Sequence, residues 1–224
     1  MSAFDILKAR EVTRLCHFTK LQSLTHIISS ESGVLASNSI RPDIKNMTDK
    51  ARYDGELDYV CCTVEYPNSW FLRKAIDNDT GTIFRDWLTL YVDLNILKLK
   101  VAKFCPCNAS TEWGRYITDD VNALFANPVR CKKEFYREQN MLSCCPTDGQ
   151  AEILIKDSIP RAYITGIAIG NENVAERIYA MLKTCGVRQI PIYVAPDVLT
   201  PSWNNMIKKG QRPSETMCVW SEGE

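Results

Sequence analysis

The stretch YVCCTVEY, residues 59–66, predicts a β-strand more clearly than any other early part of the chain. It is rich in β-branched and aromatic side chains, and the turn-forming PNS at 67–69 ends it. Outward from it, the residue patterns predict further strands over 15–19, 87–94, 101–104, 152–155, 163–169 and 190–194. They predict helices over 3–15, 21–28, 70–75 and 173–184. Short strands mixed with helices indicate a single α+β domain covering 1–224.

The composition is that of a globular protein with no charge excess. The chain has 224 residues, of which 45% are hydrophobic and 24% charged, and its 27 basic residues balance 27 acidic ones. A protein that coats duplex DNA through charge alone would normally be basic. Any contact with nucleic acid must therefore use a local patch.

No stretch of the sequence resembles a membrane or export segment. A bilayer-spanning helix needs roughly 18 consecutive apolar residues, and no window provides them. Residues 1–10 carry charges where a signal peptide would have its apolar core. We therefore expect a cytoplasmic protein that makes no use of a membrane.

Ten cysteines are many for such a chain, and their spacing does not match a structural zinc site. Two pairs are adjacent and the segment CPC at 105–107 leaves one residue between its thiols, but no CxxC is present. We expect reduced, mostly buried thiols and no metal. The alternative is a metal site built from Cys105, Cys107, Cys131 and either Cys144 or Cys145.

The two histidines limit the available chemistry. His26 lies in an apolar helical pattern, where a structural role is the usual one. His17 lies in the strand over 15–19, and strand alternation places His17 and Thr19 on one face. These two residues either make structural hydrogen bonds or line a nucleotide pocket. Phosphate-binding glycine loops, zinc-protease motifs, a nucleophile elbow and the paired zinc motif of nucleobase deaminases are all absent from the sequence.

Glu152 begins the apolar run EILI at 152–155, directly after the turn-like PTDGQ at 146–150. Alternation places Glu152 on the same face as Leu154, and a carboxylate beside buried positions needs a partner or a function. The alternative is a glutamate on an edge strand that reaches water. Arg52 lies in a polar loop, and by its residue type alone would be an ordinary solvated arginine.

Six stretches, taken in order, resemble one known family. They are CHFT at 16–19, Arg52, DYVCCTVEYPN at 58–68, FCPCNAS at 104–110, CPTDGQAEILI at 145–155 and GQRP at 210–213. Together they are similar to the DarT-type NAD-dependent ADP-ribosyltransferases, toxins of toxin–antitoxin systems that modify bases in single-stranded DNA. The resemblance implies an ADP-ribosyltransferase-like α+β fold: two packed antiparallel sheets, split by an NAD crevice and edged by helices.

The resemblance also implies roles for individual residues. Glu152 corresponds to the family's catalytic glutamate, and a carboxylate suits the positive charge that develops on ribose when nicotinamide leaves. Arg52 corresponds to the catalytic arginine and could also bind the NAD pyrophosphate, although Arg41 in the same polar loop is an alternative. The residues expected to hold NAD, the substrate, are His17, Phe18, Thr19 and Arg52.

One basic run with interleaved aromatic residues suits the nucleic-acid partner. It contains Arg130, Lys132, Lys133, Tyr136 and Arg137, and such a mixture favours phosphate contacts with base stacking. A solvated surface is the alternative for this run. We expect single-stranded DNA as acceptor, with RNA, a protein acceptor or a non-catalytic binding module as the competing hypotheses. A macrodomain-type antitoxin partner is implied by the resemblance only.

Overall fold

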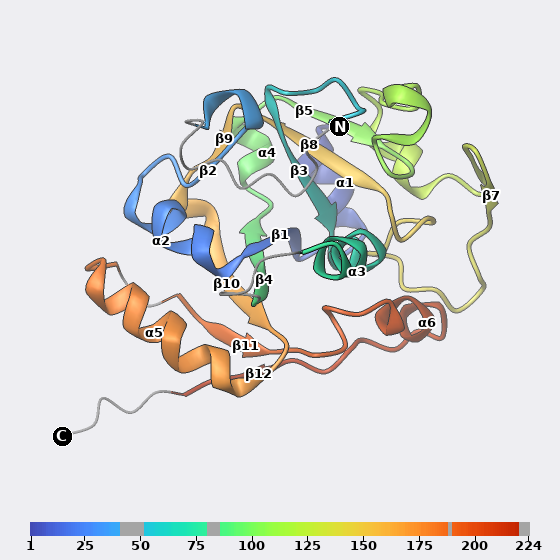
Figure 1. Ribbon diagram of the computed structural model, residues 1–224. Helices are drawn as coiled ribbons and strands as arrows, with labels where there is room; N and C mark the ends of the chain where they lie inside the picture. The colour runs from blue at the N-terminus through green and yellow to red at the C-terminus, as the bar shows by residue number, and fades with distance from the viewer. Residues whose placement is uncertain (41–51, 80–85, 188–189, 220–224) are drawn as a thin grey trace.

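A computed structural model describes residues 1–40, 52–79, 86–187 and 190–219 (Figure 1). Within these ranges eight strands form one mixed sheet in the order β12-β11-β10-β4-β1-β3-β8-β5. In chain order these strands are β1 (Arg14–Lys20), β3 (Tyr59–Val64), β4 (Trp87–Asp93), β5 (Ala102–Cys105), β8 (Glu152–Lys156), β10 (Ile164–Ile169), β11 (Ile192–Val194) and β12 (Thr216–Met217). Two small sheets pair β2 (Val34–Leu35) with β9 (Ser158–Ile159) and β6 (Val129–Arg130) with β7 (Glu134–Phe135).

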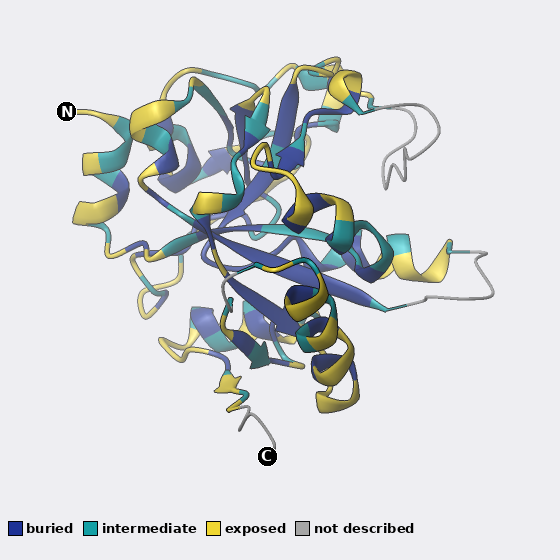
Figure 2. Cartoon of the chain, turned by 90° about the vertical axis from the view of Figure 1, so that its left-hand side faces the viewer, coloured by how far each residue is buried: buried dark blue, intermediate teal, exposed yellow. Residues whose placement is uncertain are grey.

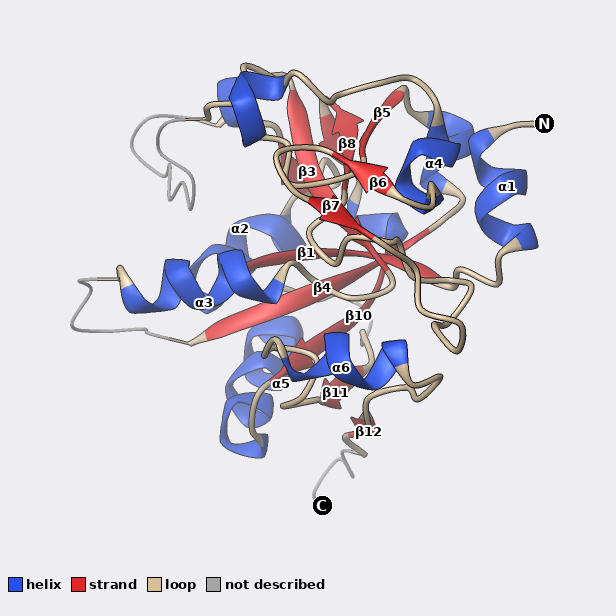
Figure 3. Cartoon of the chain, turned by 90° about the vertical axis from the view of Figure 1, so that its right-hand side faces the viewer, coloured by secondary structure: helices blue, strands red, loops and turns tan. Residues whose placement is uncertain are grey.

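Helices flank the large sheet. They are α1 (Ala3–Ala9), α2 (Leu21–Ser29), α3 (Ser69–Asp77), α4 (Ile96–Leu99), α5 (Ala175–Thr184) and α6 (Ser202–Lys208). Figure 3 shows α1 and α4 on one side of the strands and α2, α3 and α5 on the other. Figure 2 shows the strands mostly buried and the outer helix faces exposed. None of the helices in the described ranges is long and apolar enough to cross a bilayer.

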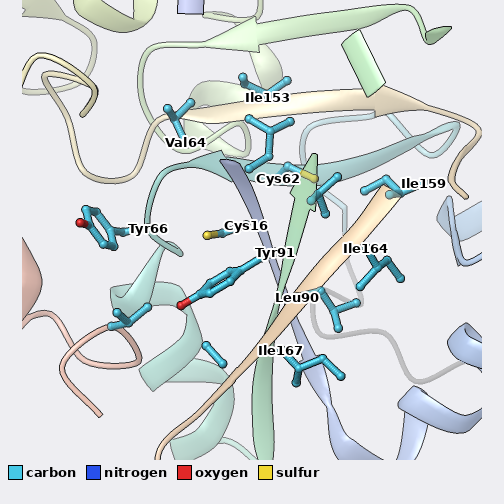
Figure 4. Packing of buried hydrophobic residues seen from close by; sticks show 14 of the residues in the cluster. Cys16, Cys62, Val64, Tyr66, Leu90, Tyr91, Ile153, Ile159, Ile164 and Ile167 are labelled. Atoms are coloured by element: carbon cyan, nitrogen blue, oxygen red, sulfur yellow. The ribbon is translucent and has the colours of Figure 1, made fainter. Parts of the chain in front are cut away.

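The core lies between the strands and these helices. Its residues come from every central strand, as Figure 4 shows, and include Cys16, Val64, Leu90, Ile153 and Ile167, each at most 2% exposed. A second, smaller cluster lies on the other face of β8. This division agrees with the predicted alternation, because β8 directs Ile153 to the main core and Leu154 to the second cluster.

The expected two sheets are two halves of one hydrogen-bonded sheet, joined at β1 and β3. Strand β1 pairs antiparallel with β4 along its whole length, but it pairs with β3 only at Leu15↔Val64 and Cys16↔Thr63. Beyond these two residue pairs, β1 continues beside β4 while β3 continues beside β8. All pairings of the large sheet are antiparallel except β10 with β11, which is parallel. The strands therefore diverge in the middle of the sheet.

The first helix is shorter than the sequence pattern indicates. The prediction of a helix over 3–15 is wrong after Ala9, although Ser2 and Asp5 form the capping box that begins it. Glu11 has a φ of 63°, which a helix does not allow, and the backbone N–H of Thr13 donates 2.8 Å to the buried carboxylate of Glu65. This bond draws the chain away from the helix axis and into β1.

Candidate active site

A cavity of about 520 Å³ opens where β1 and β3 diverge. One wall is formed by residues 16–19 of β1 and the other by residues 59–63 of β3. At one end lies α2 with His26 and Ile27, and at the other lies Glu152 at the start of β8. A site of this size takes an organic ligand such as a nucleotide. The described part of the polar loop adds Arg52 and Asp54 to the lining.

Glu152 lines this cavity next to the residue pairs that join β1 to β3, and it is only 6% exposed. Strand β8 runs between β3 and β5, so the alternative of an edge-strand glutamate in water is wrong. Oε1 accepts a hydrogen bond of 2.9 Å from Nδ2 of Asn108, and Oε2 accepts one of 3.0 Å from the backbone N–H of Ala109. The segment after β5 thus fixes both oxygens of the carboxylate.

The surroundings of Glu152 place its titration near neutrality. Burial raises the pKa of Glu152 to about 7, and the nearby carboxylate of Asp54 adds to the increase. The Ala109 N–H, the side chain of Asn68 and the charge of Arg52 act against it and lower the pKa. A buried carboxylate in a cavity, titrating near the operating pH, is typical of a catalytic group.

His17 lines the cavity as a neutral imidazole with a defined tautomer. Its Nδ1 lies 2.8 Å from the carbonyl oxygen of Cys61, and since a carbonyl only accepts, Nδ1 carries the hydrogen. Burial lowers the pKa of His17, and the charge of Arg52 also favours the neutral ring. The second ring nitrogen, Nε2, is therefore available as a hydrogen-bond acceptor. Phe18 and Thr19 line the cavity beside it.

Arg52 also lines the cavity, but its guanidinium is bonded within the fold. Nε donates 3.0 Å to Asp54, and the terminal nitrogens donate to the hydroxyl of Ser37 and to the carbonyl oxygens of Tyr59 and Glu56. Its charge reaches both His17 and Glu152, since it affects the pKa of each. The guanidinium therefore acts on the cavity as a fixed positive charge. The alternative catalytic arginine, Arg41, lies outside the described residues.

The basic run 130–137 is spread over the β6–β7 hairpin and the segment after it. Arg130 forms an exposed ion pair with Glu134 at 2.6 Å, while Lys132, Lys133 and Tyr136 are exposed. Arg137 differs, since its guanidinium donates to the carbonyl oxygens of residues 142 and 145 and to the hydroxyl of Thr147. Arg137 is thus half-buried and holds the loop before Glu152 together.

A pair of exposed aromatic rings beside the cavity-lining segment 52–54 was not predicted. Tyr53 lies between the cavity-lining residues Arg52 and Asp54, and its ring meets Trp113 edge-on at 5.0 Å between centroids. The two rings are 51% and 76% exposed. Glu112 and Trp113 both have positive φ, at 48° and 61°, and such conformations cost energy in residues other than glycine.

Gly114 fixes the position of this aromatic pair. Its φ is 82°, and a Cβ at this position would lie 2.8 Å from the carbonyl oxygen of Asp54. Only glycine allows the loop to approach Asp54 so closely. Trp113 is therefore held next to the polar loop that carries Tyr53.

The cysteines do not assemble into the alternative metal site. All ten are free thiols, and six of them are buried. Cys105 and Cys107 are 3.9 Å apart, and contact with Cys105 together with burial raises the pKa of Cys107, which keeps the thiol protonated. Cys144 and Cys145 contact each other instead, at 3.8 Å. Among the described residues no group of three or more potential ligands could hold a metal ion.

Comparison with known families agrees with this geometry. The family profile described as "ssDNA thymidine ADP-ribosyltransferase, DarT" matches residues 16–200, which include both walls of the cavity and Glu152. The chain belongs to the DarT family. It is thus an NAD-dependent ADP-ribosyltransferase that modifies single-stranded DNA, and the family description adds thymidine as the modified nucleoside. No protein with curated annotation matches the chain.

Solved DarT structures share the fold. Thermus sp. 2.9 DarT in complex with ADP-ribosylated ssDNA superposes with a TM-score of 0.61 at 17% identity, covering 84% of this chain and 96% of that one. The same protein in complex with NAD⁺ gives 0.55 at 18% identity, over 81% and 94% of the chains. Thermosipho africanus DarTG in complex with ADP-ribose gives 0.55 at 14% identity, over 84% and 51%. The expected ADP-ribosyltransferase fold is confirmed.

Proposed function

We propose that Glu152 is the catalytic carboxylate of this DarT enzyme and that the cavity between β1 and β3 binds NAD. The observation that supports this most strongly is the buried carboxylate that lines the cavity and is held by Asn108 and Ala109. A charge oriented in advance stabilises a developing positive charge without reorganisation at the moment of reaction. Glu152 in its charged form meets that requirement.

The proposed step breaks the bond between the nicotinamide nitrogen and the ribose carbon. The bonding electrons leave with nicotinamide, and positive charge develops on the ribose, as in glycoside cleavage. A ring nitrogen of thymine then forms the new bond to that carbon with its own electron pair, and the proton that this nitrogen carried passes to solvent water. Glu152 stabilises the ribose charge, so in its unprotonated form it accelerates the departure of nicotinamide. Its pKa near 7 leaves a substantial charged fraction at neutral pH.

The rest of the cavity suits the other parts of NAD. His17 presents an acceptor nitrogen to a ribose hydroxyl, and Thr19 lies on the same strand face. Phe18 and Phe71 meet edge-on at 5.9 Å and supply an apolar wall for a flat ring. Arg52 contributes a positive charge near the pyrophosphate and the reacting ribose. Its bonds to the fold make it a positioning residue as well.

Two surfaces are candidates for the DNA strand. One is the basic run, reduced to Arg130, Lys132, Lys133 and Tyr136 because Arg137 is bonded within the fold. The other is the aromatic pair Tyr53–Trp113 beside the cavity-lining segment 52–54. We favour the aromatic pair for the nucleotides next to the modified thymidine, since exposed rings on a strained backbone offer stacking surfaces to unpaired bases. The basic run then serves phosphates farther along the strand.

The biological setting follows the family. We propose that residues 1–224 act as one domain in the cytoplasm, as the toxin of a toxin–antitoxin system with a macrodomain-type antitoxin. The solved structure of Thermosipho africanus DarTG in complex with ADP-ribose supports such a pairing.

Intact-mass spectrometry of oligonucleotides tests the proposed function. The purified protein is incubated with NAD and a thymidine-containing DNA strand, the same strand with every thymidine replaced by deoxycytidine, or a matched RNA. We expect one added ADP-ribose on the first strand only, and none with Glu152→Gln. Modification by Glu152→Gln at the wild-type rate would remove Glu152 from the mechanism. Modification of RNA alone would leave the NAD site in place and reassign the acceptor.

A further inference from the structure

Asn68 is a cavity-lining residue whose amide group has an unused donor. It is 1% exposed and stands immediately before α3, within the turn that follows β3. Among the described residues, three buried side-chain atoms lack a hydrogen-bond partner: Nδ2 of Asn68, Nε1 of Trp87 and Oγ1 of Thr89. Of these three residues only Asn68 lines the cavity. A buried amide without a partner is costly unless a ligand satisfies it.

The orientation of this amide is fixed by the helix that follows. Oδ1 of Asn68 caps α3 by accepting a hydrogen bond of 3.1 Å from the backbone N–H of Phe71. Because Oδ1 is committed to the cap, the NH₂ group must occupy the opposite side of the amide. Asn68 and Glu152 both line the cavity, and the Asn68 side chain also lowers the pKa of Glu152. Nδ2 nevertheless has no hydrogen bond of ordinary length and angle to the carboxylate or to any other described group.

The cavity lining therefore offers a donor from Asn68 and an acceptor from Glu152. Each Glu152 oxygen has accepted one hydrogen bond and keeps a second lone pair. A hydroxyl group fits this pair, because its oxygen accepts from Nδ2 while its hydrogen points to the carboxylate. A carbonyl oxygen would satisfy Asn68 alone, and an N–H would satisfy Glu152 alone.

We propose that Asn68 is a substrate-binding residue that, together with Glu152, holds one hydroxyl of the ribose from which nicotinamide departs. This inference rests on the proposed function, because it takes that ribose as the ligand at Glu152. Nδ2 donates to the hydroxyl oxygen, and the hydroxyl donates to the carboxylate. The interaction keeps Glu152 charged and aligned with the ribose carbon that develops positive charge.

The test uses two variants that preserve the helix cap. Asn68→Ser and Asn68→Asp both keep an oxygen able to cap α3, and both lose the amide donor. Each is assayed by nicotinamide release with NAD and with 2′-deoxy-NAD, in which the ribose next to nicotinamide lacks its 2′-hydroxyl. Thermal unfolding and circular dichroism of each variant verify the fold. Asn171→Ser, at a surface position away from the cavity, serves as the matched control.

For wild type we expect kcat/KM to fall when the 2′-hydroxyl is removed. Asn68→Ser should lower kcat/KM with NAD by about 10-fold or more, the usual effect of losing a hydrogen bond near a charge. The ratio of kcat/KM with NAD to kcat/KM with 2′-deoxy-NAD should then be at least about fivefold smaller in Asn68→Ser than in wild type. The reason is that the two changes remove the same interaction. Asn68→Asp should in addition move the rise of kcat/KM to higher pH, since its charge repels that of Glu152.

If this ratio is the same in wild type and in both variants, the two changes act independently. That result would overturn the inference about Asn68 and would not affect the proposed role of Glu152. If Asn68→Ser does not fold, Asn68→Asp carries the same comparison. Failure of the proposed function itself has a different signature. Glu152→Gln would then release nicotinamide as fast as wild type, whatever the Asn68 variants do.

Discussion

Nδ2 of Asn108 donates a 2.9 Å hydrogen bond to Oε1 of Glu152, so the orientation of the proposed catalytic carboxylate depends on a loop residue. The next residue, Ala109, binds the other oxygen through its backbone N–H. The loop then continues to Ser110, which lines the cavity, and to Trp113, which contacts Tyr53. One segment therefore links the position of the carboxylate to the surface that we propose for the DNA strand.

The activity should depend on the charged form of Glu152. Because burial raises its pKa to about 7, kcat/KM for NAD should increase with pH through about 7 and level off above it. Glu152→Gln should lower the rate at pH 8 by about 100-fold or more and abolish this increase. Nicotinamide release between pH 5.5 and 9 measures both effects. Glu176→Gln, on the exposed face of α5, should retain the wild-type profile, and a pH-independent wild type would contradict the prediction.

Stability should show the same titration with a defined sign. The folded state raises the pKa of Glu152 from 4.5 to about 7, so its contribution to folding is fully present below pH 4.5 and is lost as pH rises through 7. Glutamine does not titrate. The free energy of unfolding of Glu152→Gln minus that of wild type should therefore increase between these pH values, by up to about 3 kcal/mol.

Urea unfolding at several pH values measures this difference. The size of the difference at any one pH also includes an unfavourable contact, because the glutamine NH₂ group would face the Asn108 donor. The change of the difference with pH is therefore the quantity to compare. A difference that decreases as pH rises would show that Glu152 is not a carboxyl with a raised pKa.

Arg52 should be more important for the fold than its polar loop indicates. Its side chain is 8% exposed beside an Asp54 side chain that is 4% exposed, and it is bonded to the hydroxyl of Ser37 and to two carbonyl oxygens. Arg52→Lys keeps the charge but loses most of the hydrogen bonds of the guanidinium group. We therefore expect the free energy of unfolding to fall by about 2 kcal/mol. Chemical denaturation checks this, with the exposed Arg73→Lys as control. Unchanged stability in Arg52→Lys would mean that these bonds add nothing to the fold.

The two candidate DNA surfaces predict different effects of substitution. Tyr53→Ala with Trp113→Ala should lower the rate of DNA modification by about 10-fold or more and leave its salt dependence unchanged, because stacking involves no counterions. Lys132→Ala with Lys133→Ala should instead flatten the salt dependence. Nicotinamide release without DNA is the control and should be unaffected in both. A loss confined to the lysine pair would place the nucleotides next to the modified thymidine on the basic run.

The strands were the most predictable part of the molecule. The predicted strands over 15–19, 87–94 and 152–155 correspond closely to β1, β4 and β8, since alternation and β-branched residues mark them. Strand β12 and helix α6 were not predicted, because both are short and depend on tertiary contacts. The helix over 3–15 failed for a related reason: the bond from Thr13 to Glu65 joins residues far apart in sequence.

The site was predictable only where a residue type was unusual in its local pattern. Glu152 was noticeable as a charge at the start of an apolar strand, and His17 as one of two histidines. Asn68 and Asn108 lie in turns, where asparagine is common, so their residue type and local pattern do not distinguish them from ordinary capping residues. Their importance depends on which atoms they face. The inward direction of the Arg137 guanidinium was equally hidden, since an arginine in a basic run is normally solvated.

The two residue pairs that join β1 to β3 also bear on how such an enzyme can diversify. One of them, Cys16↔Thr63, lines the cavity, and the pairing of Thr63 with Glu152 places the carboxylate next to this junction. The described parts of the polar loop and of the loop after β5 contribute no residue to these two pairs. Insertions and deletions in those loops would therefore change which DNA sequence is accepted while the geometry of the proposed catalytic centre stays constant.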